Sequence, residues 1–157
     1  MFKILLLIAL FISIAHNSYA NSNLFEIHIK SDNIKVIQQN NQIIFTNNVV
    51  ATKDDIVVLS DIMTVNHNKK KSDIDNIIAT DRVRISNQEF TATGDKGFYE
   101  AKSKIFTLSE NVIFNNGTSV VSGEKFIYNF KTKKSSLINN KKSNKGKVKI
   151  ILQKDHE

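Results

Sequence analysis

A tandem repeat is the feature of this sequence that most constrains its fold. Three segments, residues 49–65, 83–99 and 112–128, align without gaps. Each begins with Val, reaches an acid after a small residue twelve positions later, and has a β-favouring residue four positions beyond the acid. The small residue, the acid and the β-favouring residue are Ser60, Asp61 and Val65 in the first unit; Gly94, Asp95 and Tyr99 in the second; and Gly123, Glu124 and Tyr128 in the third. A partial fourth copy, earlier in the chain, has Ser31, Asp32 and Val36. The acids recur at intervals of 29, 34 and 29 residues, so a single unit is too short to bury its apolar face and the units are expected to stack.

Within each unit the residue pattern is typical of β-structure. Short runs of β-branched and aromatic residues alternate with groups of turn formers. The runs are residues 43–45, 56–59, 83–85, 105–108 and 112–114, and the turn formers are residues 39–42, 52–55, 86–89, 101–104 and 115–117. No stretch after residue 20 has a sustained 3.6-residue apolar period. The sequence therefore predicts an all-β fold, a closely turned antiparallel sheet with almost no helix.

The two ends of the repeat array are expected to remain open. Residues 25–30 (FEIHIK) and 147–152 (KVKIIL) both have strand-like sequences, and neither contains Pro. An uncovered end strand presents unpaired N–H and C=O groups that favour strand addition from another chain. The alternative is that these terminal segments are frayed.

The composition excludes most catalytic sites. The chain has no Cys, and His16, His28, His67 and His156 lack metal-ligand spacing. Neither nucleotide-binding glycine motifs nor a nucleophile elbow are present. The repeated acids could suggest paired carboxylate catalysis, but their periodic recurrence favours turn hydrogen bonds or a solvated edge. We therefore expect neither an enzyme nor a bound metal or cofactor.

The N-terminus has the layout of an export signal. Lys3 precedes the apolar run at residues 4–15, and Ser18-Tyr19-Ala20 offers small residues at a cleavage site. A retained membrane anchor is the alternative, although a spanning helix needs about 20 apolar residues. We expect residues 1–20 to be a cleaved signal peptide and residues 21–157 to form a single exported domain.

The whole chain has a formal net charge of +7, and its C-terminal part is especially rich in lysine. Ten lysines lie between Glu124 and Asp155 with no intervening acid, and they include Lys131, Lys133, Lys134, Lys141, Lys142, Lys145, Lys147 and Lys149. Such a cluster attracts anionic surfaces such as lipid phosphates. A solvated, flexible Lys/Asn-rich loop at residues 139–146 is the interpretation that we favour there. Nucleic acid is not an expected partner, because aromatic residues are not interleaved with these charges.

Several of these motifs together resemble a known family. They are residues 27–32 (IHIKSD), 45–49 (FTNNV), 108–112 (LSENV) and 123–128 (GEKFIY), with Gly94-Asp95 between them. In order and spacing they are similar to the lipopolysaccharide-transport periplasmic bridge family (LptA, or OstA-like), over residues 26–138. Asn47 and Glu110 stand where the family's turn has Gly. Asn tolerates left-handed backbone geometry, but Glu does so less readily, which predicts a differently shaped turn at Glu110.

The resemblance implies a twisted β-jellyroll, open at both ends, with an apolar groove along its axis. Proteins of that family work in the periplasm and receive lipopolysaccharide from an inner-membrane extraction complex. They pass the lipid to an outer-membrane translocon, and their protomers join head to tail. An acyl chain of about twelve to fourteen carbons exposed to water would cost roughly 10 kcal/mol, so a dry groove would lower the barrier to its transfer.

Large apolar residues at repeated positions are the candidates for lining this groove. They are Ile27, Ile29, Phe45, Val49, Ile85, Tyr99, Phe114 and Tyr128. The resemblance favours Ile27, Ile29, Ile85 and Tyr99, and the alternative for each residue is ordinary core packing. Three other functions remain open: a membrane-anchored subunit of the same pathway, a β-solenoid polysaccharide lyase or hydrolase, and a structural filament or adhesin.

Overall fold

The computed structural model describes residues 26–68, 73–139 and 149–152 of the 157-residue chain. The expected signal peptide, residues 1–20, lies outside this part, as does the Lys/Asn-rich segment 139–146 beyond Asn139. The described residues form ten strands and a single 3-10 turn, Gln38–Asn40. The strands are β1 (His28–Lys30), β2 (Asn33–Ile37), β3 (Gln42–Lys53), β4 (Ile56–His67), β5 (Ile74–Ser86), β6 (Thr91–Glu100), β7 (Ile105–Asn115), β8 (Ser119–Asn129), β9 (Lys134–Ile138) and β10 (Lys149–Leu152).

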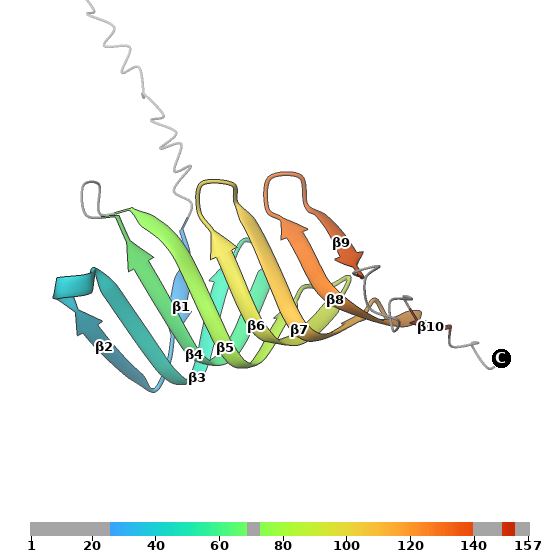
Figure 1. Cartoon of the computed structure of the whole chain (residues 1–157), viewed down its shortest axis with the longest axis horizontal. Helices are drawn as coiled ribbons and strands as arrows, with labels where there is room; N and C mark the ends of the chain where they lie inside the picture. Colours follow the sequence, from blue (N-terminus) through green and yellow to red (C-terminus); the bar gives the residue numbers. More distant parts are fainter. Residues whose placement is uncertain (1–25, 69–72, 140–148, 153–157) are drawn as a thin grey trace, which may run out of the picture.

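All ten strands belong to one antiparallel sheet (Figure 1). Strands β3 to β8 are neighbours in chain order. At one end of the sheet, β1 pairs with the second half of β3 and β2 pairs with its first half. At the other end, β10 pairs with the first half of β8 and β9 pairs with its second half. The sheet therefore curls without closing, and the predicted all-β jellyroll, open at both ends, is confirmed. No helix in the described segments is long and apolar enough to cross a membrane.

The long strands bend near their middles, so the sheet folds into two facing halves (Figure 1). Strands β3, β5 and β7 bend at pairs of non-glycine residues whose φ angles lie between 51° and 67°: Asn47-Asn48, Asp81-Arg82 and Glu110-Asn111. The pairing register shifts at each of these places, where two residues lie opposite one on the next strand. The single opposing residues are the repeated acids Asp61, Asp95 and Glu124. Each bend is thus a β-bulge, and one repeat unit corresponds to a pair of strands.

The prediction of a differently shaped turn at Glu110 is wrong. Glu110 and Asn111 have φ angles of 67° and 54°, close to the 65° and 51° of Asn47 and Asn48. The strands on both sides of β7 are paired up to the bulge, so the register imposes the left-handed conformation on whichever residue stands there.

The small residue before each acid is explained by close packing at the bends. A Cβ atom added at Gly94 would lie 2.9 Å from Cγ of Leu108, and one added at Gly123 would lie 2.7 Å from Cγ of Leu137. In the remaining unit, the buried Ser60 donates a hydrogen bond from its hydroxyl to the carbonyl oxygen of Ile62, at 3.0 Å. The repeat therefore requires a small side chain wherever a neighbouring strand packs across the corner.

The core lies between the two halves of the sheet. Its largest fully buried side chains are Phe126, Ile56, Met63, Ile85, Leu108, Val49, Val83 and Val112. Along β4, the buried positions are even-numbered up to Ser60 and odd-numbered from Met63 onwards. The alternation of buried and less buried positions therefore shifts by one residue at the bend. This shift keeps apolar side chains on the inward face in both halves of the sheet.

Candidate functional site

An apolar pocket opens between the two halves of the sheet. It is lined by side chains of β3 to β7 together with Ile27 and Phe130, including Ala51, Met63 and Ala79. Its cavity volume is about 40 Å³. Sites that hold drug-sized ligands typically measure about 300–1,000 Å³. Side chains of the two facing halves therefore occupy most of the axial groove.

The eight predicted groove residues all belong to this interior, but at different depths. Ile27 and Tyr99 line the pocket. The fully buried members are Val49, Ile85 and Tyr128, and the half-buried Ile29, Phe45 and Phe114 pack against the same core. The structure therefore brings two of the eight to the open space and six to packed positions around it.

A cluster of aromatic rings fills the interior towards the C-terminal end of the sheet. The Phe90 ring lies 5.8, 5.3 and 5.7 Å from the rings of Phe114, Phe126 and Tyr128, measured between centroids. The Phe130 ring packs edge-on against Tyr128 at 5.0 Å and against Tyr99 at 5.4 Å. The interior is thus open and mainly aliphatic beside β3 to β5, and filled by rings beside β7 and β8.

Sequence reasoning missed several of these residues. Phe126 and Phe130 flank Tyr128 at two-residue spacing, and that alternation could have identified them. Phe90 follows a group of turn formers, and the sequence gives no sign that this turn inserts its side chain into the core. Asn87 explains the insertion: its side-chain oxygen accepts hydrogen bonds from the backbone N–H groups of Glu89 and Phe90, both at 3.0 Å.

The rim of the pocket carries charged groups. Lys53, at the end of β3, is only 7% exposed and places its ammonium 5.9 Å from the centroid of the Phe130 ring. Across the rim, the ammonium of Lys133 lies 3.9 Å from a carboxylate oxygen of Asp55. Burial, with a smaller contribution from the charge of Asp54, raises the pKa of Tyr99. The open face of the pocket is therefore bordered by lysines and by two acids, and its walls are apolar.

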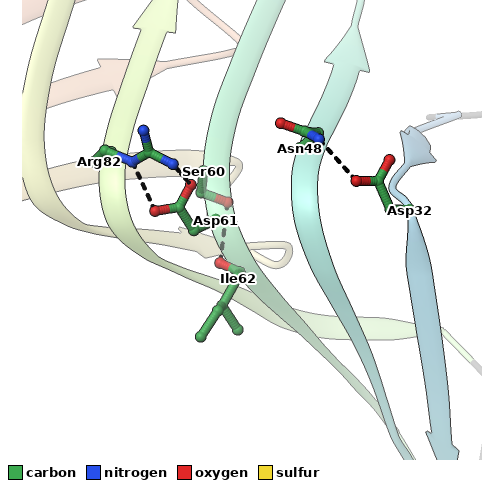
Figure 2. A network of polar contacts seen from close by, with 6 residues as sticks. All are labelled: Asp32, Asn48, Ser60, Asp61, Ile62 and Arg82. Atoms are coloured by element: carbon green, nitrogen blue, oxygen red, sulfur yellow. Dashed lines mark hydrogen bonds and ion pairs between the residues drawn. The ribbon is translucent and has the colours of Figure 1, made fainter.

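The repeated acids lie at the bends, away from this pocket. Asn48 donates to the carboxylate of Asp32 at 2.7 Å, and Arg82 donates two hydrogen bonds to Asp61 (Figure 2). Asn111 donates to Asp95 at 2.5 Å in the equivalent place. Each donor is the second residue of a left-handed pair. Asp32, Asp61 and Asp95 therefore accept exposed side-chain hydrogen bonds from a neighbouring strand at the bends, and not hydrogen bonds within a turn.

The remaining repeated acid departs from this pattern, since the backbone N–H of Glu124 donates to the side-chain oxygen of Asn139 at 3.1 Å. Among the residues that the structure describes, no three His, Asp or Glu side chains gather in a way that could hold a metal ion.

Comparison with known proteins agrees with this geometry. The family described as LptA/(LptD N-terminal domain) LPS transport protein matches residues 28–134. The fold is similar to the crystal structure of LptH from Pseudomonas aeruginosa, described as the LptA-homologous periplasmic component of the conserved lipopolysaccharide transport device. The TM-score is 0.66 at 12% identity, over 82% of this chain and 96% of that one. No curated protein matches the chain.

Proposed function

The chain belongs to the family of LptA/(LptD N-terminal domain) LPS transport proteins, and on this premise we propose that it carries lipopolysaccharide through the periplasm. The lipid's acyl chains occupy the apolar interior between the two halves of the sheet, and its sugars remain in water. The protein acts as a binding and transfer protein and not as an enzyme. One observation carries the proposal: a jellyroll of this family has an apolar pocket that opens to the surface.

Acyl chains require the groove to widen. The cavity of about 40 Å³ is far smaller than a typical ligand site of about 300–1,000 Å³. In the described part of the chain, the long strands connect the two halves of the sheet through their bends, so the halves can separate on the other side without breaking the hydrogen bonds between strands. Each entering methylene then replaces contacts that the side chains already make with one another. This exchange keeps the binding moderate, which suits a cargo that must move on.

The candidate groove residues retain their predicted role within this proposal. Ile27 and Tyr99 contact the acyl chains first, because they line the existing pocket. Ile29, Phe45, Val49, Ile85, Phe114 and Tyr128 contact the chains as the groove widens.

The edges of the sheet support a bridge built from several copies. On β2, Ile34 and Val36 are 62% and 60% exposed, and β2 pairs with β3 on only one of its sides. At the opposite end, β9 and β10 pair only with β8 among the strands that the structure describes. We propose that these ends join head to tail by strand addition, aligning the grooves of successive protomers. The terminal protomers would contact the inner-membrane extraction complex and the outer-membrane translocon.

Residues 1–20 complete the proposal as a signal peptide that is cleaved after Ala20 on export to the periplasm. Depletion of the protein in its native host, followed by membrane fractionation, tests the function. We expect newly made lipopolysaccharide to accumulate in the inner-membrane fraction and to reach the outer membrane again when the wild-type gene is restored. Normal arrival at the outer membrane during depletion would contradict the proposal.

A further inference from the structure

Three lysines come together at the rim of the pocket from three different places in the chain. Lys53 ends β3, Lys104 belongs to the turn between β6 and β7, and Lys131 belongs to the turn between β8 and β9. The last two turns lie side by side at the top of Figure 1, in yellow and orange. The backbone N–H of Phe130 donates to the carbonyl oxygen of Lys104 at 3.0 Å, which joins these two turns. Lys53 reaches the same place from the facing half, with its ammonium 5.9 Å from the centroid of the Phe130 ring.

The charges of Lys53 and Lys131 both act on the ammonium group of Lys104. Burial, followed by the charges of Lys131 and Lys53, lowers the pKa of Lys104. Two acids share the rim, Asp54 and Asp55. The carboxylate of Asp55 is engaged by Lys133 at 3.9 Å and by the side-chain amide of Asn87 at 3.2 Å. The rim therefore concentrates positive charge directly beside an apolar opening.

We infer that Lys53, Lys104 and Lys131 bind a phosphate group carried by an acylated lipid whose chain enters the pocket. The inference rests on the proposed function, because it needs the pocket to receive acyl chains. A phosphate offers several acceptor oxygens and about one to two negative charges, so three ammonium groups from one strand end and two turns can each contact a different oxygen. The phosphate replaces the mutual repulsion of the lysines with attraction, and its link to the acyl chain holds it at the rim.

The test compares lipid A with and without its phosphates, using the purified protein. In a binding assay with both lipids, the Lys104→Gln/Lys131→Gln variant is compared with the wild type. Lys53 is left in place because it is buried and contributes to packing. The matched control is Lys96→Gln/Lys125→Gln, which removes the same charge at exposed positions near the bends. Inorganic phosphate alone is measured as a third ligand.

We expect the rim variant to bind phosphorylated lipid A about fivefold more weakly than the wild type, as two partly exposed ion pairs would give. Its affinity for dephosphorylated lipid A should equal that of the wild type, and the control variant should bind both lipids normally. Inorganic phosphate alone should bind at least a hundredfold more weakly than the lipid. Equal loss in the control variant, no loss in the rim variant, or free phosphate binding as tightly as the lipid would each overturn the inference. If the wild type bound neither lipid, the proposed function itself would fail instead.

Discussion

The guanidinium of Arg82 donates two hydrogen bonds to the carboxylate of Asp61, one from Nε at 2.8 Å and one from Nη2 at 2.6 Å. The pair joins β4 to β5 at a bend of the sheet (Figure 2). Asp61 belongs to the repeat recognised in the sequence, and Arg82 is the second residue of a left-handed pair. The contact therefore connects the repeated acids to the geometry that folds the sheet into two halves.

The Asp61–Arg82 pair should make stability depend on pH. The pKa of Asp61 lies below its ordinary value of 3.8. The hydrogen bonds from Arg82 are the largest cause. Desolvation, the next largest, raises the pKa, and the charge of Arg82 lowers it further. A depressed pKa contributes stability that is complete above the unfolded value and is lost as the pH falls through the folded value. Thermal unfolding of the wild type should therefore shift to lower temperature below about pH 4. Asp61→Asn should show a smaller shift over the same range, whereas Glu100→Gln, an exposed acid at the end of β6, should keep the full shift. An unchanged acid transition in Asp61→Asn would contradict this role.

Glu110 stores backbone strain that glycine would relieve. Its φ angle of 67° lies in the left-handed region, which costs a residue with a side chain about 1–2 kcal/mol. Glycine removes that cost but loses more entropy on folding, so Glu110→Gly should raise the free energy of unfolding by up to about 1 kcal/mol. Urea denaturation measures the change. Glu110→Ala removes the same charge and keeps the strain, so a gain of equal size in this control would show that charge, and not backbone conformation, is responsible.

Gly94 should not tolerate a side chain. An added Cβ would lie 2.9 Å from Cγ of Leu108, a fully buried side chain. Overpacking of this kind typically costs about 1–3 kcal/mol, and we expect Gly94→Ala to lose that amount in urea denaturation. Adding Leu108→Ala would make room, so the double variant should lose less stability than the sum of the two single variants. If the losses in the free energy of unfolding were strictly additive, the added Cβ at position 94 and the Leu108 side chain would not be in steric conflict.

The bends explain how much of the fold the sequence could predict. Residue types and the repeat predicted the strands and their antiparallel order, because both depend on local β-propensity and turn formers. The resemblance indicated turns at Asn47 and Glu110, but the bend at Asp81-Arg82 was not predicted, because its residues match neither of the other two pairs. The conformation of all three pairs is imposed by pairing with both neighbouring strands, which is a tertiary effect that no single segment encodes.

The same limit applies to the candidate site. All eight predicted groove residues belong to the interior, because apolar residues at repeated positions share one face of the sheet. Which of them border open space depends on how the two halves face each other, and only Ile27 and Tyr99 do so. Lys53 was missed for the same reason, since a lysine beside two acids in a turn resembles a solvated residue until Phe130 is seen to pack beneath it. Lipid contact at the eight positions stays a prediction.

Filling the pocket should block lipid binding while the fold remains intact. Ala51 lines the pocket, and Ala51→Leu adds three carbon atoms to a cavity of about 40 Å³. We expect the variant to bind lipid A about 5-fold to 150-fold more weakly, since an acyl chain would have to displace the added side chain at a cost of about 1–3 kcal/mol. Val50→Leu, at the neighbouring position that points to the other face of β3, is the control and should bind normally. Normal binding by a folded Ala51→Leu variant would place the acyl chain elsewhere.

Site-specific photo-crosslinking in the native host tests most directly whether the interior of the sheet carries lipopolysaccharide. Tyr99 and Phe98 are adjacent on β6 and face opposite sides, with exposed fractions of 7% and 39%. A photoreactive residue at position 99 should capture lipopolysaccharide, and one at position 98 should capture little. Capture at position 98 without capture at position 99 would contradict transport through the interior.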